Sequence, residues 1–289
     1  MYYSASDGSA KSQGRFFAAL RSEYILLVIV AALSAGWRHL LLGKVFILLI
    51  LMVLAGILVL KMIGKAEQDW YRYRALAESI KTSAWRFSMA AEPFDDRAEM
   101  DAVRDLQAYL GRILEINRAS SSMLSANVDE EQVTNEMMKL RRSDCATRLS
   151  HYRSNRISEQ RAWYRRKAKY NKRAYFFYVS ATVIVYIAAS ISLFSNELGI
   201  SPIAALSFDP GLVAATSLIG WMQIRRHAEL AVSYGLTAHE IGIIDSAAEF
   251  ITCDSELSKF VNEAELAFSR EHTQWVARRE LIGIDPKLS

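Results

Sequence analysis

The sequence predicts an all-α integral membrane protein with two transmembrane helical hairpins and long cytoplasmic helices of coiled-coil-like spacing. Three observations predict this class. The chain contains four long apolar runs that carry almost no charged residue. Lysine and arginine gather beside these runs. The remaining segments carry apolar residues at helical spacing, and no segment alternates for long at the two-residue period of a strand.

The composition of the 289 residues excludes several classes of protein. Four prolines and 13 glycines are too few for a collagen-like or Gly/Pro-rich disordered chain. The two cysteines, Cys145 and Cys253, exclude a disulfide scaffold, and we expect reduced thiols in a cytoplasmic portion. A net charge of +4 is too small to indicate a nucleic-acid binder by itself.

The first two apolar runs predict a membrane hairpin over residues 22–63. Residues 24–37 and 45–60 contain no charged side chain, and a short turn separates them. Tyr24 and Trp37 stand at run ends, where aromatic side chains meet the membrane surface. Core helices of a soluble protein are the alternative for both runs. A cleaved signal peptide is a further alternative for the first, but its preceding segment is long and a second apolar run follows closely.

The other two runs predict a second hairpin over residues 174–224. Residues 174–196 are uncharged, and about 20 helical residues suffice to cross a bilayer. The fourth run contains one charge, Asp209, before Pro210, which predicts a helix from 210 to 224 with Asp209 as its N-cap. Because that helix is short, residues 198–208 are expected to be re-entrant or interfacial. Otherwise Asp209 is buried in the bilayer, at a cost that would itself indicate function.

The distribution of basic residues predicts the topology. Residues 153–173 contain nine basic residues and one acid, whereas the turn of the second hairpin contains no Lys or Arg. Positive segments remain on the cytoplasmic side, so both termini and the central segment should face the cytoplasm. Residues 153–173 also have a nucleic-acid interpretation. Their position beside a membrane helix favours anionic lipid as the partner instead.

The two halves of the chain correspond when the sequence is shifted by 154 residues. Five identities follow each hairpin, and each half has a hairpin, a basic exit and a long helix in the same order. A tandem duplication explains this pattern. We expect a first module at 1–125, a helical connector at 126–150 and a second module at 151–289. The identical pairs are Arg72/Arg226, Leu76/Leu230, Ala77/Ala231, Ser79/Ser233 and Ala84/Ala238.

The cytoplasmic helices are predicted to pack through apolar seams. Residues 70–91 and 230–251 carry apolar side chains in alternating steps of three and four, the spacing of a coiled coil or bundle. Each helix is expected to continue directly from a membrane helix. Further amphipathic helices are expected over 95–118, 128–142 and 254–279. The candidates for helix packing and signal coupling are Trp70, Tyr73, Arg74, Glu78, Ile80, Trp85, Tyr234, Ile241, Ile244 and Trp275.

Glu78 has two interpretations. It lies four residues after Arg74 and three before Lys81, so it can support its own helix surface. Alternatively, it forms a specific salt bridge between domains or subunits.

Polar residues inside the third and fourth runs are candidates for lining a pore. Ordinary close packing, with each hydroxyl bonded to its own backbone, is the alternative. A polar stripe along a water-filled path in an oligomer is the functional interpretation. These residues are Ser180, Thr182, Ser190, Ser192, Thr216, Ser217 and Gln223.

Motifs for catalysis or cofactor binding are absent from the sequence. It contains no Gly-rich phosphate loop, nucleophile elbow or paired-cysteine motif. His239–Glu240 resembles the start of a zinc-binding HExxH motif, but Ile243 stands where the second histidine must be. We therefore expect no catalytic, cofactor-binding or metal-binding residues and no enzyme activity.

Two segments resemble the SLATT superfamily. Residues 70–85 are similar to one subtype, through Trp70, Arg74, Glu78 and Trp85. The second half resembles another subtype. Its matching residues are Tyr152, Arg156, Ile157, Gln160, Trp163, Tyr164, Trp221, Gln223, Leu230, Tyr234, Glu271, His272 and Trp275. The resemblance implies two-helix bacterial membrane modules that act as pore-forming effectors in defence systems. Because the chain shows no evident sensor domain, it also suggests a separately encoded trigger or sensor.

Two functions follow as hypotheses. The first is a homo-oligomeric effector that permeabilises the bacterial inner membrane when its cytoplasmic helices receive a signal. The second is a membrane-anchored scaffold whose cytoplasmic helices bind partner proteins. The lipid bilayer is a partner in both, and nucleic acid is not expected.

Overall fold

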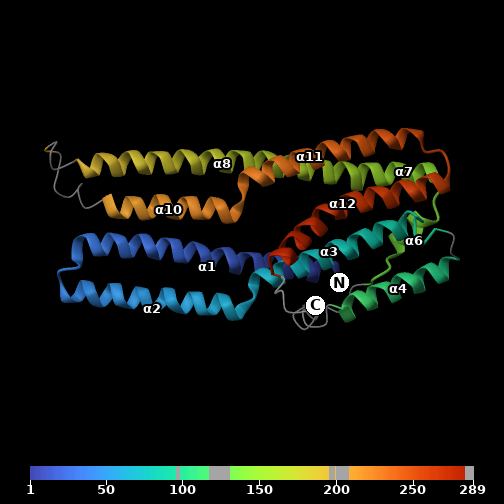
Figure 1. The fold of residues 1–289 in the computed structure, drawn as a ribbon. Coiled ribbons are helices and arrows are strands. Elements are labelled where there is room, and N and C mark those ends of the chain that lie inside the picture. Colours follow the sequence, from blue (N-terminus) through green and yellow to red (C-terminus); the bar gives the residue numbers. More distant parts are fainter. Residues whose placement is uncertain (96–97, 117–130, 195–198, 200–207, 284–289) are drawn as a thin grey trace. The chain divides into compact units, whose positions relative to one another are not determined.

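The structure is a computed structural model that describes residues 1–95, 98–116, 131–194, 199 and 208–283, with side chains up to Ser269. Every regular element in these residues is a helix, which confirms the predicted all-α class (Figure 1). The chain forms two compact units. We call Met1–Gln13, Ala66–Ala162 and His239–Ser289 the helical unit, and Gly14–Lys65 with Trp163–Ala238 the hairpin unit.

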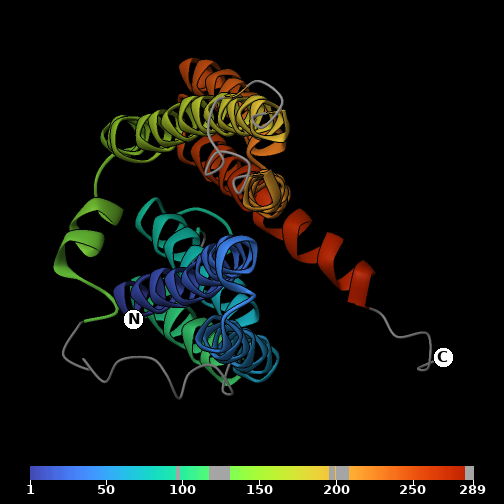
Figure 2. The same ribbon diagram turned by 90° about the vertical axis from the view of Figure 1, so that its left-hand side faces the viewer.

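The first hairpin consists of α1 (Tyr2–Trp37) and α2 (Leu41–Gly64). The two helices lie side by side and antiparallel (Figure 1 and Figure 2). The connection is tight, because a Cβ atom on Gly43 would lie 2.1 Å from the backbone oxygen of Trp37. Only glycine fits there, which fixes the start of α2. α1 begins about 20 residues before the predicted hairpin, so the N-terminal segment is helical.

The second hairpin pairs α8 (Ser158–Leu193) with α10 (Phe208–Arg225). A Cβ on Gly211 would approach the Ala189 Cβ to 3.0 Å, so the two helices pack closely there. α10 begins at Phe208, and the prediction of Asp209 as its N-cap is wrong. Asp209 lies in the first turn of α10, and its side chain is exposed on the protein surface. The predicted re-entrant segment lies outside the described residues, apart from residue 199 and Phe208.

Among the residues that the structure describes, three helices are long and apolar enough to cross a membrane. These lie within Tyr2–Trp37, Leu41–Ser88 and Cys145–Leu193, and α10 is not one of them. The apolar stretch of α2 has no buried residue, and most of its side chains are exposed. Such a surface suits a hydrocarbon environment and not water. Its most exposed members include Leu48, Met52, Val53, Leu58, Leu60 and Met62.

The helix after each hairpin starts at a backbone break. α3 (Ala66–Ser88) follows Lys65 and α11 (His227–Ala247) follows Arg226, and both basic residues have left-handed backbone, with φ of 42° and 50°. The prediction of direct continuation from the membrane helices is therefore wrong. The order α1, α2, α3 recurs as α8, α10, α11, and α1 and α8 are both 36 residues long.

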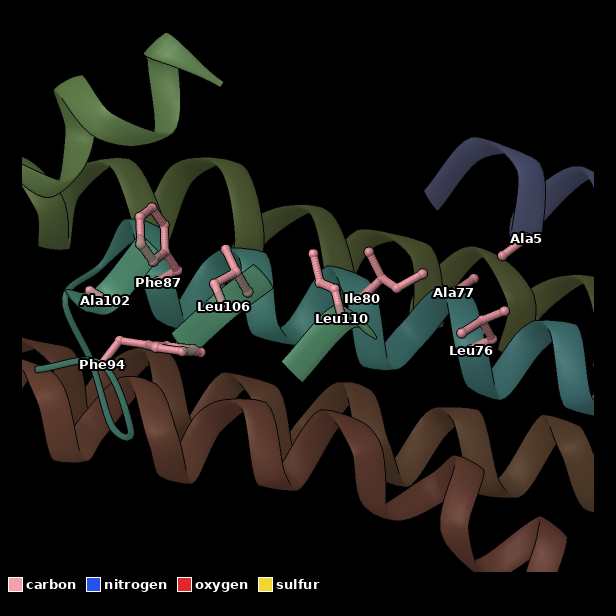
Figure 3. Close-up of a cluster of buried hydrophobic side chains, with 9 residues drawn as sticks. All are labelled: Ala5, Leu76, Ala77, Ile80, Phe87, Phe94, Ala102, Leu106 and Leu110. Atoms are coloured by element: carbon pink, nitrogen blue, oxygen red, sulfur yellow. The ribbon is translucent and has the colours of Figure 1, made fainter. Parts of the chain in front are cut away.

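The core of the helical unit lies between α3, α4 (Glu99–Ile116) and the first turns of α1. Figure 3 shows its side chains. Apolar residues on one face of α3 meet the apolar stripe that was predicted for residues 95–118. The buried members are Ala5, Leu76, Ala77, Ile80, Phe87, Phe94, Ala102, Leu106 and Leu110.

The remaining elements of the helical unit are α6 (Asn135–Arg141), α7 (Cys145–Tyr152), a π-helical turn η1 (Arg153–Ile157), a 3₁₀ turn η2 (Ala248–Phe250) and α12 (Asp254–Gly283). α6 is shorter than the helix predicted over 128–142, of which 128–130 lie outside the described residues. The Thr134 hydroxyl accepts a hydrogen bond from the Met137 amide and caps α6 at its start. α12 agrees with the helix predicted over 254–279.

Candidate functional site

A buried arginine stands at the centre of the helical unit. Arg156 lies in the π-helical turn η1 and is completely buried, as is Glu265 of α12. The Arg156 guanidinium donates from Nε to Glu265 Oε1 (2.7 Å) and from Nη2 to Glu265 Oε2 (2.6 Å). The same Nη2 also lies 3.3 Å from Glu78 Oε1 on α3. This is the two-pronged geometry that makes Arg–carboxylate pairs strong and directional.

The buried carboxylate has further partners. The Tyr152 hydroxyl donates to Glu265 Oε1 at 2.9 Å, and the Thr82 hydroxyl donates to Glu265 Oε2 at 2.9 Å. The Arg156 guanidinium also stacks over the Phe268 ring, 5.2 Å from its centre. A charge buried in this way is tolerated only because every lone pair has a donor.

Two more polar side chains complete the site. In the amide orientation that its neighbours require, the Gln160 side-chain oxygen accepts from Lys81 Nζ (3.0 Å) and Arg156 Nη1 (2.9 Å). The two cations therefore balance the carboxylates of Glu78 and Glu265. We call this set the Arg156 cluster, which comprises Arg156, Glu265, Glu78, Tyr152, Thr82, Lys81 and Gln160.

Burial and charge shift the pKa values of the cluster. Burial would lower the pKa of Arg156, but the adjacent Glu265 and Glu78 raise it above its ordinary value. Burial lowers the pKa of Lys81, and the nearby Arg156 lowers it further. Burial and then Glu265 raise the pKa of the Tyr152 hydroxyl well above 10.0. Arg156 and Tyr152 are therefore held in their protonated forms at neutral pH.

The cluster joins elements that are far apart in the sequence. Glu78 and Thr82 come from α3, Tyr152 ends α7, and Glu265 lies on α12. Because the central ion pair is inaccessible to solvent, it suits a role in fixing helix register rather than in acid–base chemistry. Among the described residues, no group of His, Cys, Asp or Glu side chains is arranged to hold a metal ion.

Two further arginines hold the loop after α3. Arg141 donates to the backbone oxygens of Phe87 (2.8 Å) and Phe94 (2.5 Å). Arg148 is buried and donates to the Met89 oxygen and to the Asp254 carboxylate, both at 2.5 Å. These bonds to Phe87, Met89 and Phe94 fix the backbone at the end of α3 and in the loop that follows it.

Within the hairpin unit, aromatic and basic side chains join the two hairpins. Phe17 of α1 packs edge-on against Trp221 of α10, with ring centres 5.8 Å apart. The Arg225 guanidinium lies 4.3 Å from the centre of the Phe17 ring. Buried His227 contacts the Asn171 side-chain oxygen at 2.8 Å, and burial followed by the charge of Arg225 lowers the pKa of His227.

Comparison with protein families identifies both halves of the chain. Residues 1–149 match the family "SMODS and SLOG-associating 2TM effector domain 3", and residues 152–275 match "SMODS and SLOG-associating 2TM effector domain 1". The chain belongs to the SLATT superfamily. The predicted arrangement of two SLATT modules in tandem is confirmed. Searches of curated proteins and of solved structures returned no match.

SLATT domains are two-transmembrane effector domains associated with conflict systems. With its long apolar helices, this tandem SLATT chain is a membrane protein. The Arg156 cluster connects the two modules, because Glu78 lies in the first and Arg156 and Glu265 lie in the second.

The residues predicted for helix packing differ in their contacts and in their burial in the SLATT chain. Glu78 pairs with Arg156, and the Trp85 ring centre lies 5.7 Å from that of Tyr152. The rings of Trp163 and Tyr164 both contact Tyr234. The buried members of the predicted set are Tyr73, Ile80, Tyr234 and Ile241, and the half-buried members are Trp70, Arg74, Glu78, Trp85 and Ile244. The side chain of Trp275 lies outside the description.

The candidate pore-lining residues do not share one environment. The hydroxyls of Thr182, Ser190 and Thr216 each donate to the backbone oxygen four residues earlier. Such bonds satisfy the hydroxyl without a partner helix. Thr182 and Ser192 are buried, and Ser217 is half-buried. The exposed members are Ser180, Ser190, Thr216 and Gln223, and a pore-lining role stays a prediction for the whole set.

Sequence reasoning did not find the ion pair at the centre of the cluster. From the sequence, Arg156 is a candidate only through the family resemblance, and Glu265 is not a candidate. The sequence does contain one signal for Glu265. It follows Ala264 on the face of α12 that also carries the buried residues Leu257 and Phe268. An acidic residue on the apolar face of a helix requires a cationic partner, and the sequence leaves that partner open.

Proposed function

We propose that this tandem SLATT chain is an effector that oligomerises and permeabilises the bacterial inner membrane. The observation that carries the proposal is the presence of three membrane-length apolar helices, one without any buried residue in its apolar stretch, in a chain built from two effector domains. Both termini face the cytoplasm in this proposal. The chain has no enzyme activity of its own, and a separately encoded protein supplies the trigger.

The membrane part of one chain is too small to enclose a pore. Four helices pack around their own side chains, so a water-filled path requires several copies. The fourth crossing is α10, whose 18 residues are about 27 Å long, close to the roughly 30 Å of a bilayer core. Exposed Ser190 and Thr216 would then supply polar groups along the path.

The Arg156 cluster is a suitable receiver of the signal. A trigger that contacts α3 or α12 changes a charge network that includes Gln160 at the start of α8. Since α8 continues as one helix into an apolar span, a change at its start acts on the membrane part. Buried polar networks with few good arrangements are suited to such two-state behaviour.

Dye release from vesicles tests the proposal. Purified protein is reconstituted into vesicles of phosphatidylethanolamine and phosphatidylglycerol at increasing protein-to-lipid ratios. We expect release to rise more steeply than in proportion to protein density, and to be lost in Ser190→Asp and Thr216→Asp. Ser255→Asp, at an exposed serine of α12, is the matched control and should leave release unchanged. Equal effects of all three substitutions would contradict a pore lined by α8 and α10.

Replacement of the hairpins separates this function from the scaffold alternative. Both hairpins are exchanged for unrelated membrane hairpins of equal length, with the helical unit unchanged. A pore effector loses toxicity in cells that contain its trigger, whereas a scaffold keeps its function.

A further inference from the structure

Helix α11 has a second apolar face that is exposed. Tyr234, Ala238 and Ile241 are buried on one side. On another side, apolar and small polar residues follow one another in steps of four and three, through α11 and into η2. We call these residues the α11 stripe: Val232, Leu236, His239, Ile243, Ser246 and Phe250.

The stripe is strongly exposed and carries no acidic or basic side chain other than His239. Val232 is 65% exposed, Leu236 61%, Ile243 72% and Phe250 80%. Single exposed apolar residues are ordinary on a protein surface. A row of four at the spacing of a coiled-coil seam, outside the apolar runs, indicates a surface that another helix covers.

The internal duplication supports the same conclusion. At the shift of 154 residues, Val232 and Leu236 correspond to Glu78 and Thr82 of α3, and Ile243 corresponds to Met89, which directly follows α3. On α3 this face is occupied within the chain, since Glu78 and Thr82 belong to the Arg156 cluster and Met89 is fully buried. If α3 and α11 are aligned with a shift of about 161 residues instead of 154, the same helix faces still correspond, because seven residues make about two helical turns. The first module thus buries the face that the second module exposes.

We propose that the α11 stripe binds the α11 stripe of a second copy of this chain, as a parallel pair in register. The proposal rests on the proposed function in one respect, the insertion of the chain into a membrane. Copies inserted with one topology present α11 in the same direction and at the same depth. A heptad stripe then meets an identical stripe, layer by layer, across a two-fold axis.

The residues beside the stripe fit a second copy. In a parallel pair, Gly235 lies opposite Glu240 of the second copy, and Gly242 lies opposite Ala247. Neither pairing brings like charges together, and small residues allow close approach. The Arg161 guanidinium lies over Gly242, 2.9 Å from the position of an added Cβ. In the parallel pair, the side of α11 that carries Gly242 faces the side that carries Glu240 in the second copy. Because the Arg161 cation lies on the Gly242 side, this pairing is more favourable than one between two acidic sides.

The size of the stripe predicts density-dependent association. Four large apolar side chains on each helix cover less than the roughly 800 Å² per partner of a standard interface. A pair of this size is weak in solution. Confinement to a membrane raises the effective concentration of the second copy, so pairs form when the protein is dense in the bilayer.

Cysteine cross-linking tests the pair. Cys145 and Cys253 are first replaced by serine. Ser246→Cys then places a thiol in the stripe, and Ala108→Cys places one at an exposed position of α4, outside α11, as the matched control. In vesicles treated with copper phenanthroline and oxygen, which accept the two electrons from each pair of thiols, we expect Ser246→Cys to form a covalent dimer. Ala108→Cys should form several-fold less.

Substitution within the stripe provides the second measurement. Ile243→Asp in the Ser246→Cys background buries a carboxylate in the seam and should reduce cross-linking at least about tenfold, which corresponds to ~1.4 kcal/mol. Phe250→Ser is a milder variant that should reduce it less, and circular dichroism with membrane extraction verifies that both variants fold and insert. Equal cross-linking at positions 246 and 108, or no effect of Ile243→Asp, would overturn the proposal.

Dye release from the same vesicles separates this inference from the proposed function. Cross-linking through Ser246→Cys without dye release supports the α11 pair and contradicts permeabilisation. Dye release without such cross-linking overturns the α11 pair and leaves permeabilisation supported. Absence of cross-linking in the pure protein, with cross-linking to another protein in cells, would identify a different occupant and overturn the proposal.

Discussion

Substitution of Arg156 by methionine should destabilise the helical unit strongly. In Arg156→Met, the Glu265 carboxylate remains completely buried with only the Tyr152 and Thr82 hydroxyls as donors. Removal of one partner from a buried ion pair costs about 3–5 kcal/mol, because the other charge is left uncompensated. For a domain of this size, each kcal/mol lowers Tm by roughly 2–4 °C, so Tm should fall by about 6–20 °C.

The double variant Arg156→Met/Glu265→Leu tests the physical cause. It replaces the pair with apolar side chains, so no unpaired charge remains in the core. We expect it to recover at least about 2 kcal/mol of the loss, since apolar replacements of buried pairs are often neutral. The assay is thermal unfolding followed by circular dichroism in mild detergent. Arg104→Met, which removes a solvent-exposed pair with Asp101, is the matched control and should leave Tm unchanged. An Arg156→Met effect no larger than that of Arg104→Met, or additive effects in the double variant, would refute the reasoning.

Three further predictions follow from other parts of the molecule. Because the folded pKa of Tyr152 is raised, the folded state keeps this proton above pH 10 while the unfolded chain loses it, so stability is full below about pH 10 and falls by up to ~1.4 kcal/mol per pH unit above it. In Tyr152→Phe, the part of this pH dependence of stability that comes from the Tyr152 proton should disappear, as measured by urea unfolding at pH values between about 8 and 11. Gly43→Ala should destabilise the first hairpin in detergent, whereas Gly56→Ala, where an added Cβ meets nothing within 4 Å, should not. Leu51→Arg should reduce membrane insertion by about 2.5–3.5 kcal/mol in a glycosylation assay, whereas Met100→Arg, at an exposed position of α4, should have no effect.

The membrane helices were predictable because a bilayer imposes a contiguous signal. A helix that crosses a membrane needs about 20 apolar residues in one stretch, and such a stretch is visible directly in the sequence. The apolar stripe of α4 was predictable for a related reason, since Leu106 and Leu110 repeat at the helical period. Burial of both residues agrees with that prediction.

The Arg156 cluster was not predictable because its partners are set by tertiary packing. Glu78 has Arg74 and Lys81 at favourable spacing on its own helix, yet the structure pairs it with Arg156. The π-helical turn that positions Arg156 has no local sequence signature. The breaks at Lys65 and Arg226 were also missed, because left-handed backbone is usual for glycine and rare for lysine and arginine.

The duplicated modules suggest how one helix face acquired two uses, and this idea is testable. The first module places Glu78 and Thr82 on that face of α3 and pairs them within the chain. The second has Val232 and Leu236 at the corresponding positions of α11. Return of the second module to the first-module residues, in Val232→Glu/Leu236→Thr, should abolish self-association, because a parallel pair would place two carboxylates in one layer of the seam.

The same double variant should leave the stability of the single chain almost unchanged. Both side chains are exposed, and surface substitutions away from special features usually change stability by less than about 0.5 kcal/mol. Cross-linking through Ser246→Cys measures association, and thermal unfolding in dilute detergent measures stability. Loss of association with an unchanged Tm would show that α11 serves contacts between copies, as α3 serves contacts within one. A lowered Tm would show instead that Val232 and Leu236 pack against the chain itself, and the assignment of this face to a second copy would fail.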